Sequence, residues 1–318
     1  MKRSDLRTES RKSLTPVWFG GWQASGWVTS RESRFTETLE HYLSLGGNAI
    51  DTAEGYGNGL SEKLIGQVLN SKEREDVFVA TKFHHYRTSL SQIEKALDRS
   101  LKNLRTDYVD LLYQHWPAKE RVSERVIESI ISLREKGKVR NIGVSNWDQN
   151  VFQELFDPTL IDVIQNCYNL LWRKDESWFP NFQENGRPRY LAYSPLAQGL
   201  LAGRRELFQK VPSDHRSKNV LFDQSSAKDT LALLEKLDFI SKEFRVPTAT
   251  LSLAWVLSRP FVSGAIAGAS SLGQVDENFA ATSFLNSEAT GLADKLFSRP
   301  IDLERPLKSM WEWHPRAE

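Results

Sequence analysis

Four ionisable side chains stand at the ends of short apolar runs, where together they could transfer a proton to a substrate. Asp51, Lys82 and His115 each end or directly follow such a run, and Tyr56 comes five residues after Asp51. A tyrosine is a poor acid at neutral pH, because its ordinary pKa is about 10. A nearby ammonium stabilises phenolate, and a carboxylate paired with that ammonium keeps it charged. The set therefore predicts that Tyr56 is an acid catalyst backed by Lys82 and Asp51. His115 is predicted to orient a substrate carbonyl or to share the proton.

The elements that must position these residues alternate regularly. Short β-branched or apolar runs begin at residues 17, 48, 77, 108, 141, 160, 189 and 263. Amphipathic segments between them predict helices over residues 37–45, 61–70, 91–104, 124–136, 151–156 and 227–244. Strict alternation of strand and helix implies parallel strands with crossover helices, and eight such units fit a closed barrel. We therefore expect an α/β fold, a single (β/α)8 TIM barrel over residues 1–318.

In such a barrel the catalytic groups come from the carboxyl ends of the strands and from the loops after them. The four ionisable residues are therefore expected in one pocket. The long connection over residues 197–226 is typical of a functional lid, although disorder is the simpler interpretation. Two nucleotide-binding motifs are missing: FGGWQASG lacks the G-x-G-x-x-G spacing, and GYGNGLSEK lacks the Gly-Lys-Ser/Thr of a Walker loop.

Composition excludes several classes of protein. The 318 residues include 42 Lys and Arg against 41 Asp and Glu, a net charge of +1 that gives no indication of nucleic-acid binding. No apolar run approaches the roughly 20 residues needed to cross a bilayer. The single cysteine, Cys167, excludes an internal disulfide and is expected to be an inert buried residue. We expect a cytoplasmic protein without a metal, and His84 and His85 are expected to lie in a solvated loop.

Seven segments resemble the successive motifs of the aldo-keto reductase superfamily, in the order and spacing of that family: GGNAIDTAEGYGNGLSEKLIG, VFVATK, YVDLLYQHWP, GKVRNIGVSNW, IQNCYNLL, LAYSPLAQGLL and AIAGASSLGQVDEN. The resemblance spans about residues 17–281. It implies an eight-stranded α/β barrel that reduces aldehydes and ketones with NADPH, or runs the reverse oxidation, without a metal. It also implies that Tyr56 protonates the carbonyl oxygen, that Lys82 paired with Asp51 lowers the pKa of Tyr56, and that His115 polarises the carbonyl or relays the proton.

The resemblance further implies a cofactor site. Ser145, Asn146 and Gln165 match the trio that hydrogen-bonds the nicotinamide carboxamide, and Tyr193 matches the aromatic residue on which the nicotinamide ring stacks. The other matched positions, at the first loop, the pyrophosphate and the adenine side, are Gly21, Trp22, Asp51, Ser194, Leu196, Gln198, Ser270, Ser271, Gln274, Glu277 and Asn278.

The choice between NADPH and NADH depends on a departure from the family pattern. Many members hold the 2'-phosphate of NADPH with Lys or Arg, but no basic residue lies between Ser263 and Asn278. The G-A-S-S-x-x-Q variant resembles a branch, including the β subunits of voltage-gated potassium channels, that still takes NADPH. In that branch an arginine after the seventh strand supplies the charge, and Arg216 matches it. We expect NADP(H), with NAD(H) left open.

Tryptophans at or just after strand ends indicate the substrate side of the pocket. Trp22, Trp27, Trp116 and Trp147 are predicted to form an aromatic wall around an apolar carbonyl substrate. We therefore predict an oxidoreductase for a small aldehyde or ketone, with neither nucleic acid nor membrane as partner. A cofactor-loaded regulatory subunit, like the channel β subunits, is the alternative, and a metal-dependent hydrolase lacks a convincing cluster of ligands. The sequence identifies neither the particular substrate nor the oligomeric state.

Overall fold

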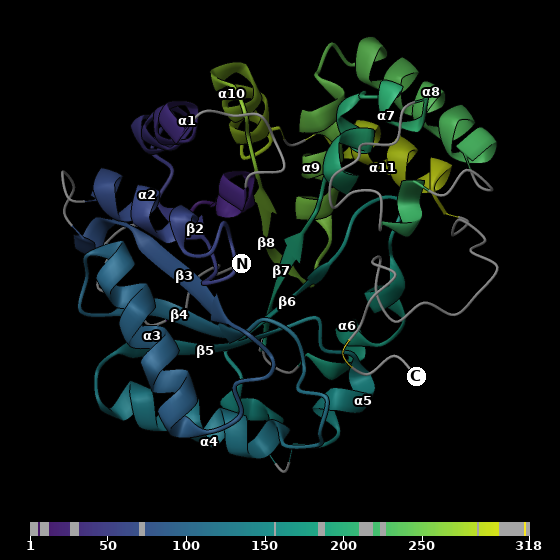
Figure 1. Ribbon diagram of the computed structural model, residues 1–318. Helices are drawn as coiled ribbons and strands as arrows, with labels where there is room; N and C mark the ends of the chain where they lie inside the picture. Colours follow the sequence, from purple (N-terminus) through teal and green to yellow (C-terminus); the bar gives the residue numbers. More distant parts are fainter. Residues whose placement is uncertain are drawn as a thin grey trace.

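A computed structural model of the chain closes eight parallel strands into a barrel (Figure 1). It describes residues 6, 13–25, 32–69, 74–155, 157–183, 188–209, 219–222, 227–284, 286–298 and 315. The strands are β1 Val17–Gly20, β2 Ala49–Asp51, β3 Phe78–Phe83, β4 Val109–Gln114, β5 Val139–Ser145, β6 Val163–Cys167, β7 Arg189–Tyr193 and β8 Val262–Ala267. Each pairs with the next along the chain, and β8 pairs with β1. The predicted TIM barrel and its eight strands are confirmed.

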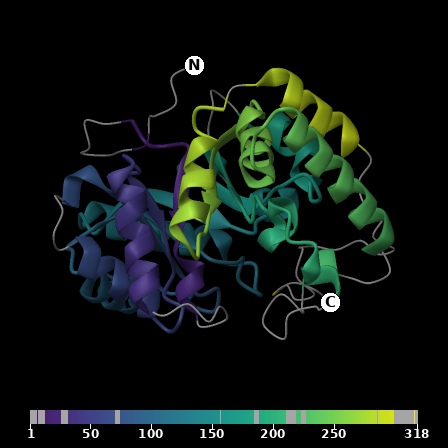
Figure 2. The ribbon, with the colours of Figure 1, turned by 90° about the horizontal axis from the view of Figure 1, so that it is seen from above.

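Helices cover the outside of this barrel (Figures 1 and 2). They are α1 Glu32–Ser44, α2 Leu60–Leu69, α3 Leu90–Leu104, α4 Ser123–Glu135, α5 Gln149–Phe152, α6 Phe179–Phe182, α7 Glu206–Gln209, α8 Ala227–Glu243, α9 Thr248–Ser258, α10 Leu272–Ala280 and α11 Ser287–Leu296. Because the barrel closes, α1 and α10 lie side by side although they are far apart in sequence (Figure 2). Within the described ranges, no helix is both long and apolar enough to span a membrane.

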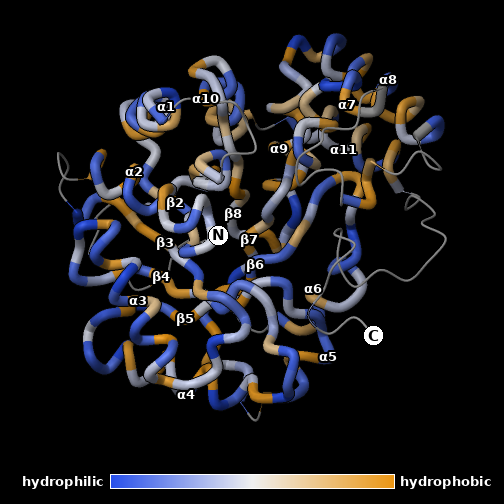
Figure 3. Tube along the Cα trace, in the orientation of Figure 1, coloured by the Kyte–Doolittle hydropathy of each residue, from blue (hydrophilic) through white to orange (hydrophobic). Residues whose placement is uncertain are grey.

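The barrel is a packed core. Side chains from seven strands meet inside it, and on β4 Leu111 and Tyr113 belong to this inner cluster, whereas Leu112 packs with the outer layer under the helices. The ring of Trp18 meets that of Phe78 edge-on, with centroids 5.2 Å apart. Apolar stretches follow β3 and β4 in Figure 3, and polar and apolar residues alternate along α3 and α4. Because the interior is filled, a ligand must bind at one end of the barrel.

Several helices differ from the sequence-based expectation: α1 begins at Glu32 and not at residue 37, and α6, α7, α10 and α11 were not among the predicted ranges. The helix predicted over residues 151–156 ends at Phe152, because Asp157 and Pro158 start a separate 3-10 turn, with Asp157 accepting a hydrogen bond from Thr159. The prediction also lacked α9. Nearly all of α9 from Ala249 to Val256 is buried, so its sequence has no amphipathic period by which a surface helix could be recognised.

Close contact between α2 and α3 fixes the helix that follows the Tyr56 loop. On α2, Glu62 is 1% exposed and accepts hydrogen bonds from Thr81 (2.7 Å) and Asn103 (3.1 Å). A Cβ atom on Gly66 would lie 2.4 Å from the carbonyl oxygen of Asn103 and 2.8 Å from the backbone of Leu104. Since backbone atoms cannot rotate away, only glycine allows this approach.

We expect Gly66→Ala to lower the free energy of unfolding by about 1–3 kcal/mol, because the added methyl group forces α2 and α3 apart. Gly291 in α11 is the matched control: nothing lies within 4 Å of an added Cβ, so Gly291→Ala should raise stability by up to about 1 kcal/mol. Urea titrations of the two variants and the wild type measure both effects, and equal stability of the two variants would contradict the close approach.

Candidate active site

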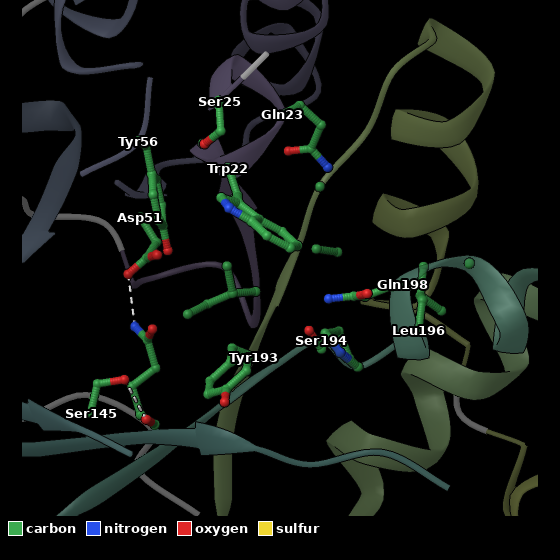
Figure 4. A pocket seen from close by; sticks show the side chains of 18 of the residues that line it. Trp22, Gln23, Ser25, Asp51, Tyr56, Ser145, Tyr193, Ser194, Leu196 and Gln198 are labelled. Carbon is green, nitrogen blue, oxygen red and sulfur yellow. Dashed lines mark hydrogen bonds between the residues drawn. The ribbon is translucent and has the colours of Figure 1, made fainter. Parts of the chain in front are cut away.

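A cleft of about 1140 Å³ opens at the carboxyl end of the barrel, where residues from all eight strands or from the loops after them meet. Figure 4 shows part of its wall, with Trp22 and Gln198 pointing into the same space from opposite sides. The predicted site residues that line the cleft are Gly21, Trp22, Asp51, Tyr56, His115, Trp116, Ser145, Asn146, Gln165, Tyr193, Ser194, Leu196, Gln198, Ser270, Gln274, Glu277 and Asn278.

Lys82 lies below the cleft and joins the predicted catalytic residues. It is 1% exposed, and its Nζ donates to Asp51 Oδ1 at 2.5 Å, to the carbonyl oxygen of Thr52 at 2.9 Å and to Tyr56 Oη at 3.3 Å. Parallel pairing of β2 with β3 places Asp51, the last residue of β2, beside Ala80, two residues before Lys82 on β3. Gln165 Nε2 donates to the other oxygen of Asp51 at 2.7 Å, the dashed line from Asp51 in Figure 4.

The donors in this network determine where the phenolic hydrogen of Tyr56 points. An ammonium has three donors and no acceptor, so the oxygen of Tyr56 accepts the hydrogen bond from Lys82. The hydroxyl hydrogen of Tyr56 is then left for a different acceptor. Since Tyr56 lines the cleft, that acceptor can be a substrate oxygen.

Burial outweighs the ammonium in setting the acidity of Tyr56. Desolvation raises the pKa of the phenol above its ordinary value, and Lys82 acts in the opposite direction without cancelling it. Burial alone would lower the pKa of Lys82, but Asp51 and Tyr56 together raise it. The expectation that Lys82 lowers the pKa of Tyr56 is therefore right for the contribution of the ammonium and wrong for the net shift. Tyr56 is protonated at neutral pH, as an acid catalyst must be.

His115 follows β4 and stands beside Tyr56. The two rings meet edge-on with centroids 5.7 Å apart, and the backbone N–H of His115 donates to Phe83 at 3.0 Å. Burial, with Lys82 and the neighbouring histidines, lowers the pKa of His115 well below its ordinary value. Its imidazole is therefore neutral at neutral pH and offers one donor and one acceptor.

Three of the residues predicted for the nicotinamide side form one hydrogen-bonded group. Asn146 adopts a left-handed backbone with φ of 60°, and its amide donates to the carbonyl of His115 at 2.9 Å and to Ser145 Oγ at 3.1 Å. Tyr193 donates to the amide oxygen of Asn146 at 2.6 Å. These bonds orient the side chains before any ligand arrives.

The segment after β7 adopts a backbone that few sequences tolerate. Ser194, Ala197, Gln198 and Gly199 have φ of 49°, 45°, 55° and 109°. Positive φ in non-glycine residues is uncommon and clusters at functional sites. Both polar atoms of the buried Gln198 amide lack a hydrogen-bond partner among the described residues, although the side chain lines the cleft.

The opposite wall is the amino end of α10. Ser271 caps this helix by accepting from the backbone of Gln274, is exposed, and does not line the cleft. Ser270 does line it and donates from its N–H and Oγ to Gln274 Oε1, at 2.8 and 3.0 Å. Asn278 donates to the carbonyl of Gly268 at 3.2 Å. Of the predicted pair Ser270 and Ser271, only Ser270 therefore lines the cleft.

The aromatic wall differs from the prediction. Trp22 and Trp116 line the cleft, but the prediction for Trp147 is wrong: its side chain is 0% exposed and packs edge-on against Phe152, 5.4 Å between centroids. Trp147 follows a strand end, yet its side chain packs into the outer core and not into the mouth of the barrel. Trp27, like Arg216, lies outside the described residues.

Sequence analysis missed several residues of the cleft. Gln23 and Ser25 follow β1 directly, so the rule that located Asp51 would have located them too. His84 and His85 were expected in a solvated loop, but both line the cleft. Arg204, in the loop after β7, also lines it, and its exposed side chain pairs with Glu206 at 3.1 Å.

The chemistry of these side chains fits a bound dinucleotide. Gln23 Oε1, Ser25 Oγ and the Gln198 amide are buried polar atoms for which the described part of the chain supplies no partner. Buried polar groups are nearly always hydrogen-bonded in native proteins, so their presence in one cleft indicates a polar ligand. The amino end of α10 favours negative charge there.

Comparisons with known proteins agree with this geometry. A model of the Aldo/keto reductase family matches residues 16–292. The NADH-specific methylglyoxal reductase of Escherichia coli (strain K12) is 31% identical, over 89% of this chain and 92% of that protein. A probable voltage-gated potassium channel subunit beta of Arabidopsis thaliana is 30% identical, over 91% of this chain and 93% of that protein. An aldo-keto reductase of Klebsiella pneumoniae in complex with NADPH superposes with a TM-score of 0.76 at 26% identity, covering 98% of this chain and 100% of that chain.

The matched segment contains every strand of the barrel together with Asp51, Tyr56 and Lys82. It also contains the cleft wall formed by the β7 loop and α10. The chain therefore belongs to the aldo/keto reductase family and is an NAD(P)-dependent oxidoreductase.

Proposed function

We propose that the protein reduces a small aldehyde or ketone to the alcohol with NADPH, with Tyr56 as the general acid. The observation that carries the proposal is the buried Lys82, which contacts both Asp51 Oδ1 and Tyr56 Oη beneath the cleft. A fixed ammonium behind a protonated phenol is an arrangement that serves proton transfer and has no evident structural use.

The proton step follows from the residues of the chain. A carbonyl oxygen that gains negative charge in the transition state accepts the hydroxyl hydrogen of Tyr56. Lys82 stabilises the phenolate that Tyr56 becomes, and Asp51 keeps Lys82 protonated. The neutral imidazole of His115 donates a second hydrogen bond to the carbonyl oxygen and so fixes its orientation.

The cofactor would be held by the polar walls of the cleft. Ser145, Asn146 and Gln165, which line the cleft, would hold its nicotinamide end, and Tyr193 would provide an aromatic surface there. Gln198 and the amino end of α10 provide donors for the phosphates. When bound, the reduced nicotinamide supplies a hydride to the carbonyl carbon.

Arg204 is our candidate for the 2'-phosphate contact. It is a cationic side chain on the cofactor wall, and its partner Glu206 is exposed, so the pair can separate at little cost. Arg216, proposed from the family resemblance, is the second candidate. Relatives of both preferences exist, one named NADH-specific and one solved with NADPH.

The similarity to a channel subunit does not favour a regulatory role without turnover, because a relative named as a reductase is equally similar. Purified protein that binds NADPH tightly but turns over none of a broad panel of aldehydes and ketones would reverse this conclusion.

Tyr56→Phe should lower the rate of carbonyl reduction by about 10²–10⁴-fold, the usual contribution of a general acid. The Kd for NADPH should stay within about twofold, because the substitution changes no charge and leaves the ring in place. Rates are followed by loss of NADPH absorbance. Tyr108→Phe, beside Arg74 and Arg140 at the opposite end of the barrel, is the control; full turnover by Tyr56→Phe would rule out the acid role.

Arg204→Gln should weaken NADPH binding by about tenfold while NADH binding is unchanged, because a charge-assisted contact to the 2'-phosphate is lost. Quenching of tryptophan fluorescence reports both affinities. The matched control is Arg205→Gln, since Arg205 is adjacent but pairs with Asp238 and does not line the cleft. If Arg216→Gln alone changes the ratio of the two affinities, the contact belongs to Arg216.

The lowered pKa of His115 predicts a dependence of stability on pH. Below the ordinary histidine pKa of about 6.5, the unfolded chain takes up a proton at this residue that the folded chain does not, so the free energy of unfolding falls as the pH falls toward the folded pKa. His115→Asn removes this dependence. We expect its slope between pH 7 and pH 5 to be smaller than that of the wild type by up to about 1.4 kcal/mol per pH unit. Urea titrations at several pH values give both slopes; identical slopes would mean that folding leaves the pKa of the His115 imidazole unshifted.

A further inference from the structure

We propose that Glu54 is a positioning residue that, with Arg87, ties the loop carrying Tyr56 to the loop that follows Lys82 and so holds the phenol at its distance from the ammonium. The inference rests on the proposed function, because it concerns the same proton donor. Glu54 lies two residues before Tyr56 and touches neither Tyr56 Oη nor Lys82 Nζ through its side chain.

The Glu54 carboxylate is engaged on both oxygens. Oε1 accepts from the backbone N–H of His84 and from Arg87 Nε, each at 2.8 Å, and Oε2 accepts from Arg87 Nη2 at 3.0 Å. Arg99 on α3 adds a longer contact to Oε2, at 3.3 Å. The side chains of Glu54 and Arg87 are only 11% and 18% exposed. This fork-to-fork geometry is the strong form of an arginine–carboxylate pair.

The Glu54–Arg87 pair connects the two loops at the point where backbone pairing between β2 and β3 stops. Beyond the end of β2 the ladder continues with Thr52 N–H donating to Ala80 (2.9 Å) and Glu54 N–H donating to Lys82 (3.0 Å). The N–H of His84, the first residue after β3, donates to the Glu54 side chain in place of a backbone carbonyl. The chain then turns to Tyr56, whose N–H donates to Ala53. Glu54 is thus the last connection to β3 before the general acid.

The far side of Tyr56 is fixed differently. Gly57, Asn58 and Gly59 all have left-handed backbones, with φ of 58°, 53° and 87°, and the carbonyl of Tyr56 accepts from Ser61 on α2 at 3.3 Å. The contact from Lys82 Nζ to Tyr56 Oη, at 3.3 Å, is the longest that the ammonium makes. A small displacement of the loop would therefore break this contact first.

The same pair holds a residue of the cleft wall. The ring of His84 stacks on Tyr86 with centroids 5.1 Å apart and planes 13° apart, and a Cβ on Gly55 would lie 2.9 Å from this ring. His84 is thus held between Tyr86 and the glycine that separates Glu54 from Tyr56. The Glu54–Arg87 pair thereby couples the general acid to the part of the cleft wall that His84 forms.

Two near-isosteric substitutions test the proposal. Glu54→Gln removes the charge, and Arg87→Met removes the guanidinium while keeping the aliphatic stem. In each we expect kcat to fall by about tenfold, since a misplacement of about 1 Å can cost about 10²-fold and a smaller one correspondingly less, with the Kd for NADPH unchanged. The double variant should lose no more than either single variant, because both changes break one connection. Arg87→Lys keeps the charge but not the two-pronged contact, and should restore only part of the kcat lost in Arg87→Met.

Arg74 provides a matched control. It pairs with the buried Asp110 at 2.7 Å, its side chain is also 18% exposed, and it lies at the amino end of the strands, away from the cleft. Arg74→Met should lower the free energy of unfolding at least as much as Arg87→Met while leaving kcat unchanged. A kcat within about twofold of the wild type in both Glu54→Gln and Arg87→Met, or losses that multiply in the double variant, would overturn the positioning role.

Tyr56→Phe, measured in parallel, separates this proposal from the proposed function. If Tyr56→Phe retains full turnover, the acid itself is misassigned and the proposed mechanism fails. If Tyr56→Phe is inactive while the Glu54 and Arg87 variants turn over at the wild-type rate, only the positioning role fails.

Discussion

The buried ammonium of Lys82 is the constraint on which the site depends. It carries three N–H donors and meets three acceptors, Asp51 Oδ1, the carbonyl of Thr52 and Tyr56 Oη. A buried ion pair contributes little net stability, but removal of one partner leaves an uncompensated charge that costs about 3–5 kcal/mol. The residues around Lys82 are therefore not independent, because the loss of any one acceptor leaves the buried ammonium without full compensation.

The barrel meets this requirement through strand register. Parallel pairing places Asp51 beside Ala80, two residues before Lys82, and Lys82 beside Tyr113, so residues from three adjacent strands come together near the carboxyl end. Inside the barrel the large side chains of Phe78, Leu111 and Tyr113 fill the space below. The polar groups consequently collect at the one end that is not filled, and the loops after the strands supply the remainder of the cleft.

Sequence alone was sufficient to predict which strand ends form the site. It was insufficient to predict the directions of side chains in the loops or the net pKa shifts. Strand ends predict which residues reach the mouth of the barrel, so Asp51, Tyr56 and His115 could be placed in one cleft. Side-chain direction after a strand end depends on loop conformation, which is why Trp147 was misplaced. The net pKa shift of Tyr56 was equally out of reach, since it depends on how fully folding removes water from the phenol.

Charge balance determines how the other half of the cleft must recognise an anionic cofactor. The chain has a net charge of only +1, Asp51 neutralises Lys82, and Glu206 pairs with Arg204. Without a broad positive field, binding relies on short-range donors whose positions are fixed beforehand. The segment from Ser194 to Gly199, in which Ser194, Ala197, Gln198 and Gly199 have positive φ, brings the Gln198 amide to the cleft. On the proposed function, cofactor affinity therefore depends more on the conformation of this loop than on the total charge of the protein.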